Sequence, residues 1–402
     1  MLTRQGWLAL TGGAAVILTA RLLGIGELYV FGACALGLVA FAAVYVGTKR
    51  LDLEVERTVQ PARVHAGHSS RVDLRIRNLR ATDTPVLRLD DPVSGTRGAE
   101  LLVPPLSRGA VAVATYRLPT DRRGLLRVGP LSVAVSDPFG LTRTAIPAAD
   151  AIEVTVYPRI EEITPVPFTA GHDPTAGARQ PHALGRAGDD FYALRTYVVG
   201  DDLRRIHWPS TARHDELLVR HQEQPWQGRT TILLDVRRST HDETSFETAV
   251  SAAASIAVAN GARRDLIRVL TTDGIDSGFG TGHAHVQAVL EHLAVVQMTG
   301  TASLRALIEV VSKNGGGGAL VVVLAQVTTD ELTGIGRLRS RYGSVTVVVT
   351  GDVRVRTPAA TTGAAVPVVR GRTTRDFATA WDAAVKAQRS GHRSSVRTGV
   401  GR

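Results

Sequence analysis

The densest group of residues able to do chemistry lies between Gly188 and Arg213. Acidic and basic side chains share this segment: Asp189, Asp190, Asp201, Asp202, Arg195, Arg204, Arg205 and Arg213. Opposite charges at this density favour a structural ion-pair network, which we expect to surround Trp208. The alternative is a docking surface, because complementary charge fixes the register between protein partners.

Carboxylates elsewhere raise the possibility of an enzyme. Asp235 ends the apolar run 231–235, and Asp273 and Asp276 lie near His283 and His285 in a pattern that would suit a hydrolase. No recognisable nucleophile accompanies them. The chain also lacks the GxxxxGK[ST] pattern of a phosphate-binding loop. We therefore expect no enzyme, and the alternative is a hydrolase or metal-dependent enzyme that uses these loops.

The elements that must position Asp235 alternate between strand and helix. Apolar strands are expected at 231–235, 266–270, 319–324 and 345–349, with a short edge strand at 366–369. Helices are expected at 246–262, 286–296, 304–312, 330–341 and 376–387. Strands that are apolar throughout and alternate with helices indicate a mostly parallel, doubly wound α/β sheet. The glycine-rich segment 278–282 is expected to form a loop over the edge of that sheet.

Residues 51–160 show a different pattern. Val72, Leu74 and Ile76 alternate strictly with charged residues, and similar short runs are separated by turn residues. This pattern predicts an antiparallel, immunoglobulin-like β-sandwich.

Two apolar runs precede the sandwich. They extend from Trp7 to Leu23 and from Leu28 to Val46, and each has about the 20 residues that span a bilayer. Arg4 and Lys49 flank the pair, so residues 1–50 are expected to form a transmembrane helical hairpin with both ends in the cytoplasm. The soluble domains would then be cytoplasmic, on a multi-pass protein of the cell membrane.

The remaining segments complete the expected organisation. Residues 161–190, which alternate prolines and glycines, are expected to be a linker, residues 191–388 the α/β domain, and residues 389–402 a disordered tail. The formal net charge is +10. We attribute this charge to composition and to an anionic membrane surface, and we expect no nucleic-acid partner. Cys34 is the single cysteine, which excludes internal disulfides.

Two motifs identify a family resemblance. The first combines Leu-Arg-x-Tyr, Gly-Asp-Asp, Arg-x-Ile-His-Trp and Ser-x-Ala-Arg patterns, with Arg195, Tyr197, Gly200, Asp201, Asp202, Arg204, His207, Trp208, Ser210 and Arg213 at their defining positions. The second combines Arg123-Gly124, Val128-Gly129-Pro130 and a run through Asp137, Pro138, Phe139, Gly140 and Leu141. The whole chain thereby resembles the bacterial domain of unknown function 58 family, whose members pair a β-sandwich with a von Willebrand A-like domain. The resemblance implies association with a MoxR-type AAA+ ATPase, as a membrane-anchored adaptor in protein assembly or maturation.

The resemblance also implies where a cation would bind. Von Willebrand A domains hold a divalent cation through Asp-x-Ser-x-Ser, and here Asp235 and Ser239 match while Arg237 replaces the first serine. Thr301 is a candidate third ligand, and Gln326 stands where a later aspartate is expected. Oxygen ligands would suit Mg²⁺. Because two ligands are missing, we expect an Asp235–Arg237 contact instead, and no cofactor.

Overall fold

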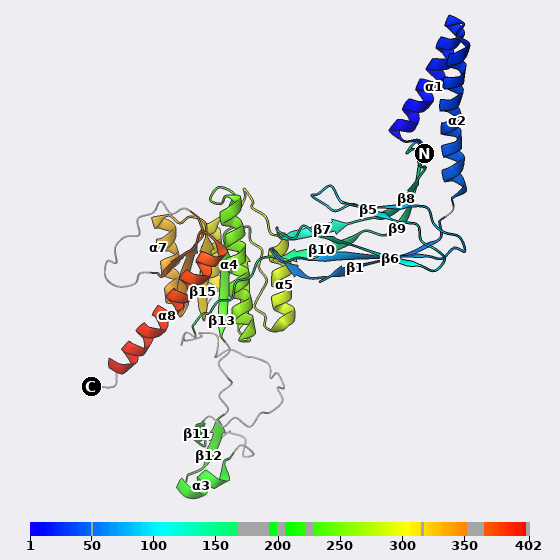
Figure 1. The fold of residues 1–402 in the computed structure, drawn as a ribbon. Coiled ribbons are helices and arrows are strands. Elements are labelled where there is room, and N and C mark those ends of the chain that lie inside the picture. Colours follow the sequence, from blue (N-terminus) through cyan, green and yellow to red (C-terminus); the bar gives the residue numbers. More distant parts are fainter. Residues whose placement is uncertain are drawn as a thin grey trace. The chain divides into compact units, whose positions relative to one another are not determined.

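The protein is described by a computed structural model that covers residues 1–49, 51–167, 193–198, 206–214, 216–221, 228–314, 317–351 and 366–398. It is a mixed α/β protein with two apolar helices at the N-terminus and several β-sheets (Figure 1). The chain divides into two compact units. One comprises Met1–Arg159 with Leu290–Val296, and the other comprises Ile160–Val289 and Gln297–Arg402.

The first unit begins with an antiparallel pair of helices, α1 (Arg4–Leu23) and α2 (Gly26–Thr48). Both are long and apolar enough to cross a membrane. The turn between them is short because Gly24 adopts φ 68°, a left-handed conformation that glycine tolerates. The helices approach closely at Gly32, where an added Cβ would lie 2.4 Å from Cγ1 of Ile17. Small residues at such crossings let the two backbones pack together.

Three small sheets follow and share one core. Their strand orders are β1-β3-β6, β2-β10-β7 and β5-β4-β8-β9. The strands span Leu53–Gln60 (β1), Val64–His65 (β2), Arg71–Asn78 (β3), Leu87–Asp91 (β4), Ala99–Val103 (β5), Val111–Arg117 (β6), Gly124–Val128 (β7), Leu131–Ser136 (β8), Arg143–Ala149 (β9) and Ile152–Tyr157 (β10). Leu74 and Ile76 from β3 meet Leu89 from β4 and Val133 from β8 in that core. The expected alternation is present in β3, whose buried and exposed residues follow each other along the strand.

The second unit contains a five-stranded parallel sheet in the order β14-β13-β15-β16-β17. These strands are Arg229–Leu234 (β13), Leu266–Thr271 (β14), Ala319–Leu324 (β15), Ser344–Val349 (β16) and Val368–Arg370 (β17). The helices are Glu243–Ala262 (α4), Gly282–Val295 (α5), Leu304–Asn314 (α6), Thr329–Arg337 (α7) and Thr374–Thr398 (α8), with a 3₁₀ turn at Leu338–Ser340 (η2). The chain passes from β13 to β14 on one side and then to β15 on the other. The strand order therefore reverses at β13, a place where open α/β sheets present ligands.

The glycine-rich segment 278–282 lies at the edge of this sheet, as expected. Ile267 of β14 donates its N–H to the Gly280 carbonyl at 2.8 Å, and the Gly280 N–H returns a bond to Ile267 at 3.0 Å. The segment therefore covers the outer edge of β14.

Two expectations about the connecting segments need correction. The first residues of the expected linker pack onto the α/β unit, because Val166 is buried and Thr164 receives a bond from the Trp381 indole at 2.8 Å. The rest of the linker lies outside the described residues. The expected disordered tail is also wrong up to Thr398, because α8 continues to that residue. Residues 389–398 hold three arginines, which favour helix, but also three serines and a glycine, which do not, so composition alone did not reveal the extension.

Candidate functional site

Asp235 lies at the carboxyl end of β13, the central strand at which the sheet order reverses. Its side chain is fully buried. Its Oδ1 accepts bonds from the Arg237 N–H at 3.0 Å and from the Thr272 hydroxyl at 3.2 Å. Its Oδ2 accepts a bond from the Thr240 hydroxyl at 3.0 Å. A buried carboxylate needs this number of partners because an uncompensated charge inside a protein is costly.

The Arg237 guanidinium takes the place in which a cation would face this carboxylate. Its Nε lies 2.9 Å from Oδ1 of Asp235, and its Nη2 lies 2.9 Å from Oδ2. This two-pronged geometry is the strong form of the arginine–carboxylate pair. The expected Asp235–Arg237 contact is therefore present. The residues at this position do not fit Mg²⁺, because both carboxylate oxygens already face the guanidinium.

A second carboxylate completes the arginine's surroundings. Glu331 Oε1 lies 2.7 Å from Arg237 Nη1, while Oε2 accepts the Thr328 N–H at 2.8 Å. Glu331 thus joins Arg237 and also closes the capping box that begins α7. Burial would lower the pKa of Arg237, but hydrogen bonds and charge from Asp235 and Glu331 raise it overall. The guanidinium therefore stays charged.

His241 forms the floor of the same site. Its side chain is fully buried, its Nε2 lies 4.0 Å from Asp235 Oδ2, and its ring packs edge-on against Phe246. Burial lowers the pKa of His241 despite the nearby Asp235 carboxylate. The imidazole is therefore neutral at physiological pH and adds no second cation beside Arg237.

The two other expected ligands do not reach Asp235. Ser239 and Thr301 are exposed, and the Thr301 hydroxyl instead lies 3.1 Å from that of Thr299. Thr272, which the sequence analysis missed, contacts Asp235. Its position directly after β14 was the available signal, since parallel strands present their carboxyl ends at one edge. Within the described ranges, no group of three or more His, Cys, Asp or Glu residues is placed to hold a metal ion.

Two of the residues that could suit a hydrolase, Asp276 and His285, make structural contacts. Asp276 pairs with Arg268, whose Nε lies 2.9 Å from Oδ1. The hydrogen bond from Arg268 lowers the pKa of Asp276. His285 lies 2.9 Å from the Ile267 carbonyl through Nε2. These contacts hold the edge of the sheet and bring no acid–base pair together.

The first family motif forms a small element of its own. β11 (Ala193–Thr196), which contains Arg195, pairs with β12 (Leu218–His221), and α3 (Trp208–His214) lies between them in the chain. Tyr197 donates its N–H to the Leu217 carbonyl at 2.7 Å, and His207 Nδ1 lies 2.8 Å from the Ser210 hydroxyl. Gly200, Asp201, Asp202 and Arg204 lie outside the described residues.

Trp208 lies on the surface of this small element. Its side chain is 64% exposed, and Arg213 of the same helix is also exposed. Asp189, Asp190, Asp201, Asp202, Arg204 and Arg205 lie outside the described residues, so the ion-pair network expected around Trp208 stays a prediction. Ile206 and Val219 are buried in this element.

The second family motif ties the helices to the sandwich. Asp137 is buried and accepts a bond from the Phe139 N–H at 2.9 Å, Pro138 lies between them, and Gly140 turns the chain with φ 69°. The Thr142 hydroxyl lies 2.9 Å from the Ala42 carbonyl of α2 and 3.0 Å from Asp137 Oδ2. Phe139 is exposed. This loop therefore has a structural role, because it connects the sandwich to α2.

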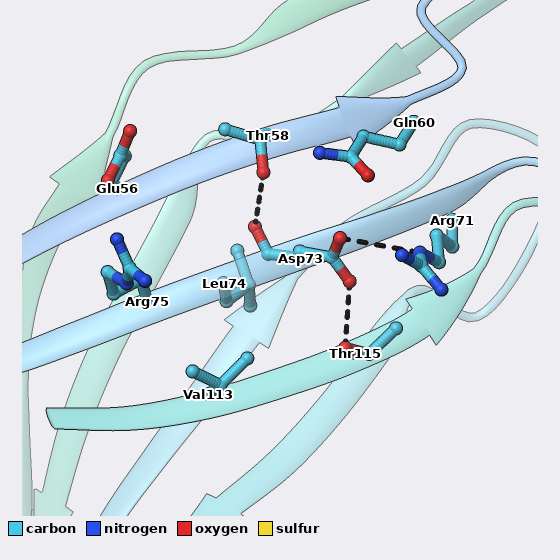
Figure 2. A pocket seen from close by; sticks show the side chains of 9 residues that line it. All are labelled: Glu56, Thr58, Gln60, Arg71, Asp73, Leu74, Arg75, Val113 and Thr115. Carbon is cyan, nitrogen blue, oxygen red and sulfur yellow. Dashed lines mark hydrogen bonds and ion pairs between the residues drawn. The ribbon is translucent and has the colours of Figure 1, made fainter.

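A hollow lies on the β1-β3-β6 sheet of the sandwich. It encloses about 470 Å³ on the outer, polar face of the sheet (Figure 2). Asp73 lies in its centre, where it accepts a bond from the Thr115 hydroxyl at 2.8 Å and pairs with Arg71 at 3.4 Å (Figure 2). The hollow is shallow and its side chains bond to one another, as is usual for the wet face of an antiparallel sheet.

Comparison with solved structures reveals only partial likenesses. The CARDB domain of the PF1109 protein from Pyrococcus furiosus, solved with di-metal ions, is 19% identical over 26% of this chain and 88% of that chain, with a TM-score of 0.21. A β-glucosidase from Listeria innocua is 19% identical over 26% of this chain and 16% of that chain, with a TM-score of 0.19. The alkylpurine DNA glycosylase AlkC from Pseudomonas fluorescens is 13% identical over 32% of this chain and 38% of that chain, with a TM-score of 0.18.

No curated protein matches the chain. A family model does match, over residues 193–391, and it is described as protein of unknown function DUF58. This range starts at β11 and includes the first family motif, the parallel sheet and most of α8. The chain is therefore a member of the DUF58 family.

Proposed function

We propose that this protein is a membrane-anchored, non-catalytic interaction protein that works with a MoxR-type AAA+ ATPase in the assembly or maturation of protein complexes. Its α/β unit is taken as von Willebrand A-like, with its binding face at the carboxyl ends of the parallel strands. One observation carries the proposal. Arg237 closes the buried Asp235 carboxylate beneath loops that expose Ser239 and Thr301. A buried Asp235–Arg237 pair beneath exposed loops suits protein contact, and it leaves no position for a reacting metal.

The chain's own chemistry supports a partner that supplies energy. Its sequence has no phosphate-binding loop of the P-loop type, so ATP-driven work would come from another protein. The two apolar helices would hold the unit near the bilayer, which raises the local concentration of a partner assembled there. Arg4 and Lys49 at their outer ends favour the cytoplasmic side.

The partner is tested by affinity purification of the tagged full-length chain from detergent-solubilised membranes, followed by identification of the proteins that copurify. The expected result is a MoxR-type ATPase in stoichiometric amount. The matched control is the same chain carrying Asp235→Lys, which should disrupt the buried floor and release the ATPase. Recovery of no ATPase with the parent chain would remove the main support for the adaptor role.

A further inference from the structure

One end of the β-sandwich is fixed directly to the two apolar helices. Thr3, the N-cap of α1, donates its N–H to the Leu141 carbonyl at 2.9 Å, and Thr142 contacts Ala42 of α2. After α2 ends at Thr48, the backbone carbonyl of Asp52 accepts a hydrogen bond from the Leu79 N–H at 3.0 Å. The loop after β3 therefore lies beside the exit of α2. If the helices cross a bilayer, this end of the sandwich lies at its surface.

A polar pocket opens at this end. It encloses about 270 Å³ and lies between the exit of α2 and the loop that follows β3. Its lining includes two cations, two carboxylates and three threonine hydroxyls, which belong to Lys49, Arg80, Asp52, Asp83, Thr48, Thr82 and Thr84. The hollow around Asp73 lies on a sheet face, whereas this pocket lies where the chain leaves the apolar helices.

The residues around the pocket are of the kind found at a membrane surface. The Lys49 ammonium lies 5.0 Å from the centre of the Tyr45 ring, on the last turns of α2. Tyrosine and lysine at the end of an apolar helix are typical anchors at the headgroup level. Two exposed apolar side chains flank the loop that lines the pocket. Leu79 is 50% exposed and Val86 is 53% exposed. Their exposure would be relieved by contact with lipid.

We propose that this pocket binds a phospholipid headgroup that carries both a phosphate and a primary ammonium, as phosphatidylethanolamine does. Lys49 and Arg80 would bind the phosphate, and the Thr82 hydroxyl would donate to one of its oxygens. Asp52 and Asp83 would accept hydrogen bonds from the ammonium. A purely anionic headgroup would face both carboxylates, and a trimethylated ammonium has no N–H to donate, so each fits the pocket less well.

This inference rests on the membrane anchorage in the proposed function, but its test is independent of the ATPase. Full-length protein is purified in dodecyl maltoside and freed of native lipid. Short-chain phosphatidylethanolamine, phosphatidylglycerol and phosphatidylcholine are then titrated separately, and bound lipid per chain is counted by native mass spectrometry. The parent should bind phosphatidylethanolamine about tenfold more tightly than phosphatidylcholine. This difference is the one expected when a ligand lacks one charge-assisted hydrogen bond.

The variants give opposite signatures for the two halves of the headgroup. Asp83→Asn should weaken phosphatidylethanolamine binding and strengthen phosphatidylglycerol binding, because a carboxylate is removed. Arg80→Gln should weaken the binding of both lipids. Lys49→Gln should have the same effect, and it serves as the second variant if Arg80→Gln fails to fold. The control is Arg97→Gln, an exposed arginine in the turn between β4 and β5, outside the pocket lining. It should leave all three affinities unchanged.

Equal binding of the three lipids by the parent, or affinities unchanged in both Asp83→Asn and Lys49→Gln, would overturn the proposal. Failure of the ATPase to copurify would leave the lipid preference intact. Failure of the pocket would likewise leave ATPase copurification intact, so the two outcomes are distinguishable.

Discussion

At the scale of single residues, Arg237 decides which positive charge faces the buried Asp235 carboxylate. Arg237 supplies the positive charge that Asp235 requires, and Glu331 holds the arginine from the other side. A protein-supplied cation cannot dissociate, so we expect the loops above it not to depend on metal supply. The unit should therefore hold its shape whether divalent cations are present or chelated.

Removing this cation should destabilise the α/β unit. Arg237→Ala leaves Asp235 buried with no countercharge, which should cost about 3 kcal/mol and lower the melting temperature by roughly 6–12 °C. Its neighbour Arg238 is exposed, and its side chain donates a hydrogen bond to the Met298 carbonyl at 3.2 Å. Arg238→Ala should therefore stay within about 0.5 kcal/mol of the parent. Circular dichroism melting of both variants in detergent makes the comparison, and equal melting temperatures would contradict this role for Arg237.

Asp137 should give the sandwich a defined acid sensitivity. Burial would raise its pKa, but hydrogen bonds from Thr142 and Phe139 outweigh burial and lower it. Because the folded-state pKa lies below the unfolded one, Asp137 stabilises the fold fully above about pH 4, and the contribution is lost as pH falls through the folded-state value.

The measurement for Asp137 compares the unfolding free energies of the parent and Asp137→Asn across acidic pH. Their difference should be constant above about pH 5 and shrink below about pH 4. A difference that grows as the pH falls would reverse the sign and contradict the assignment. Leu141→Val, a conservative change in the same loop, should show a pH-independent difference.

The sequence was informative about chemistry at the residue scale and uninformative about some placements. The Asp235–Arg237 contact was expected from the family resemblance, which places a cation beside Asp235 and finds Arg237 where a serine ligand would stand. Thr272 did not, because its approach to Asp235 depends on the register between β13 and β14. The exposure of Trp208 could not be read from the sequence either, because the density of charge around a residue says nothing about its burial.

At the scale of elements, the apolar helices form a specific pair whose contact is set by small residues. Gly32 of α2 has Ile17 and the Gly13 carbonyl within 2.9 Å of any added Cβ, whereas Gly37 on the same helix has nothing within 4 Å. The same substitution at the two positions should therefore have opposite consequences.

Gly32→Ala should separate the helices and lower the melting temperature of the detergent-solubilised chain. Gly37→Ala should leave it unchanged or slightly higher, since alanine favours helix over glycine by about 1 kcal/mol. The two variants differ only in position, so general effects of an added methyl group cancel. If both variants melt alike, the crossing of α1 and α2 does not lie at Gly32.

Element types were largely readable from the sequence, and their ends were not. The strands of the parallel sheet could be predicted because both faces of the sheet are covered and the strands are therefore apolar throughout. In β15 every residue is buried. The start of the α/β unit was hidden, because residues 160–167 gain their place from single contacts such as that between the Thr164 N–H and Asp382, at 2.8 Å. No periodic pattern marks such a segment.

At the scale of the whole molecule, the chain forms two units of different construction, and the first begins with the apolar helix pair. The apolar runs predict an integral membrane protein, and the proposed orientation places the soluble units inside the cell. Alkaline carbonate should leave the chain in the membrane pellet, and protease added to intact cells should spare the soluble units. A soluble bacterial protein of known location serves as the control for lysis. Release by carbonate would contradict the anchor, and digestion in intact cells would contradict the orientation.

The central claim is that the carboxyl ends of the parallel strands bind the ATPase, and a matched set of arginine variants tests it most directly. Ser239→Arg and Thr301→Arg place a bulky charge on the exposed loops above Asp235. Ser340→Arg makes the same change at an exposed residue of η2, just before β16 begins and therefore at the opposite ends of the strands. Folding of each variant is checked by circular dichroism, and ATPase binding by pull-down from detergent. The account predicts that both loop variants lose most of the bound ATPase while Ser340→Arg retains it. Parent-like binding by both folded loop variants, or an equal loss in Ser340→Arg, would contradict it.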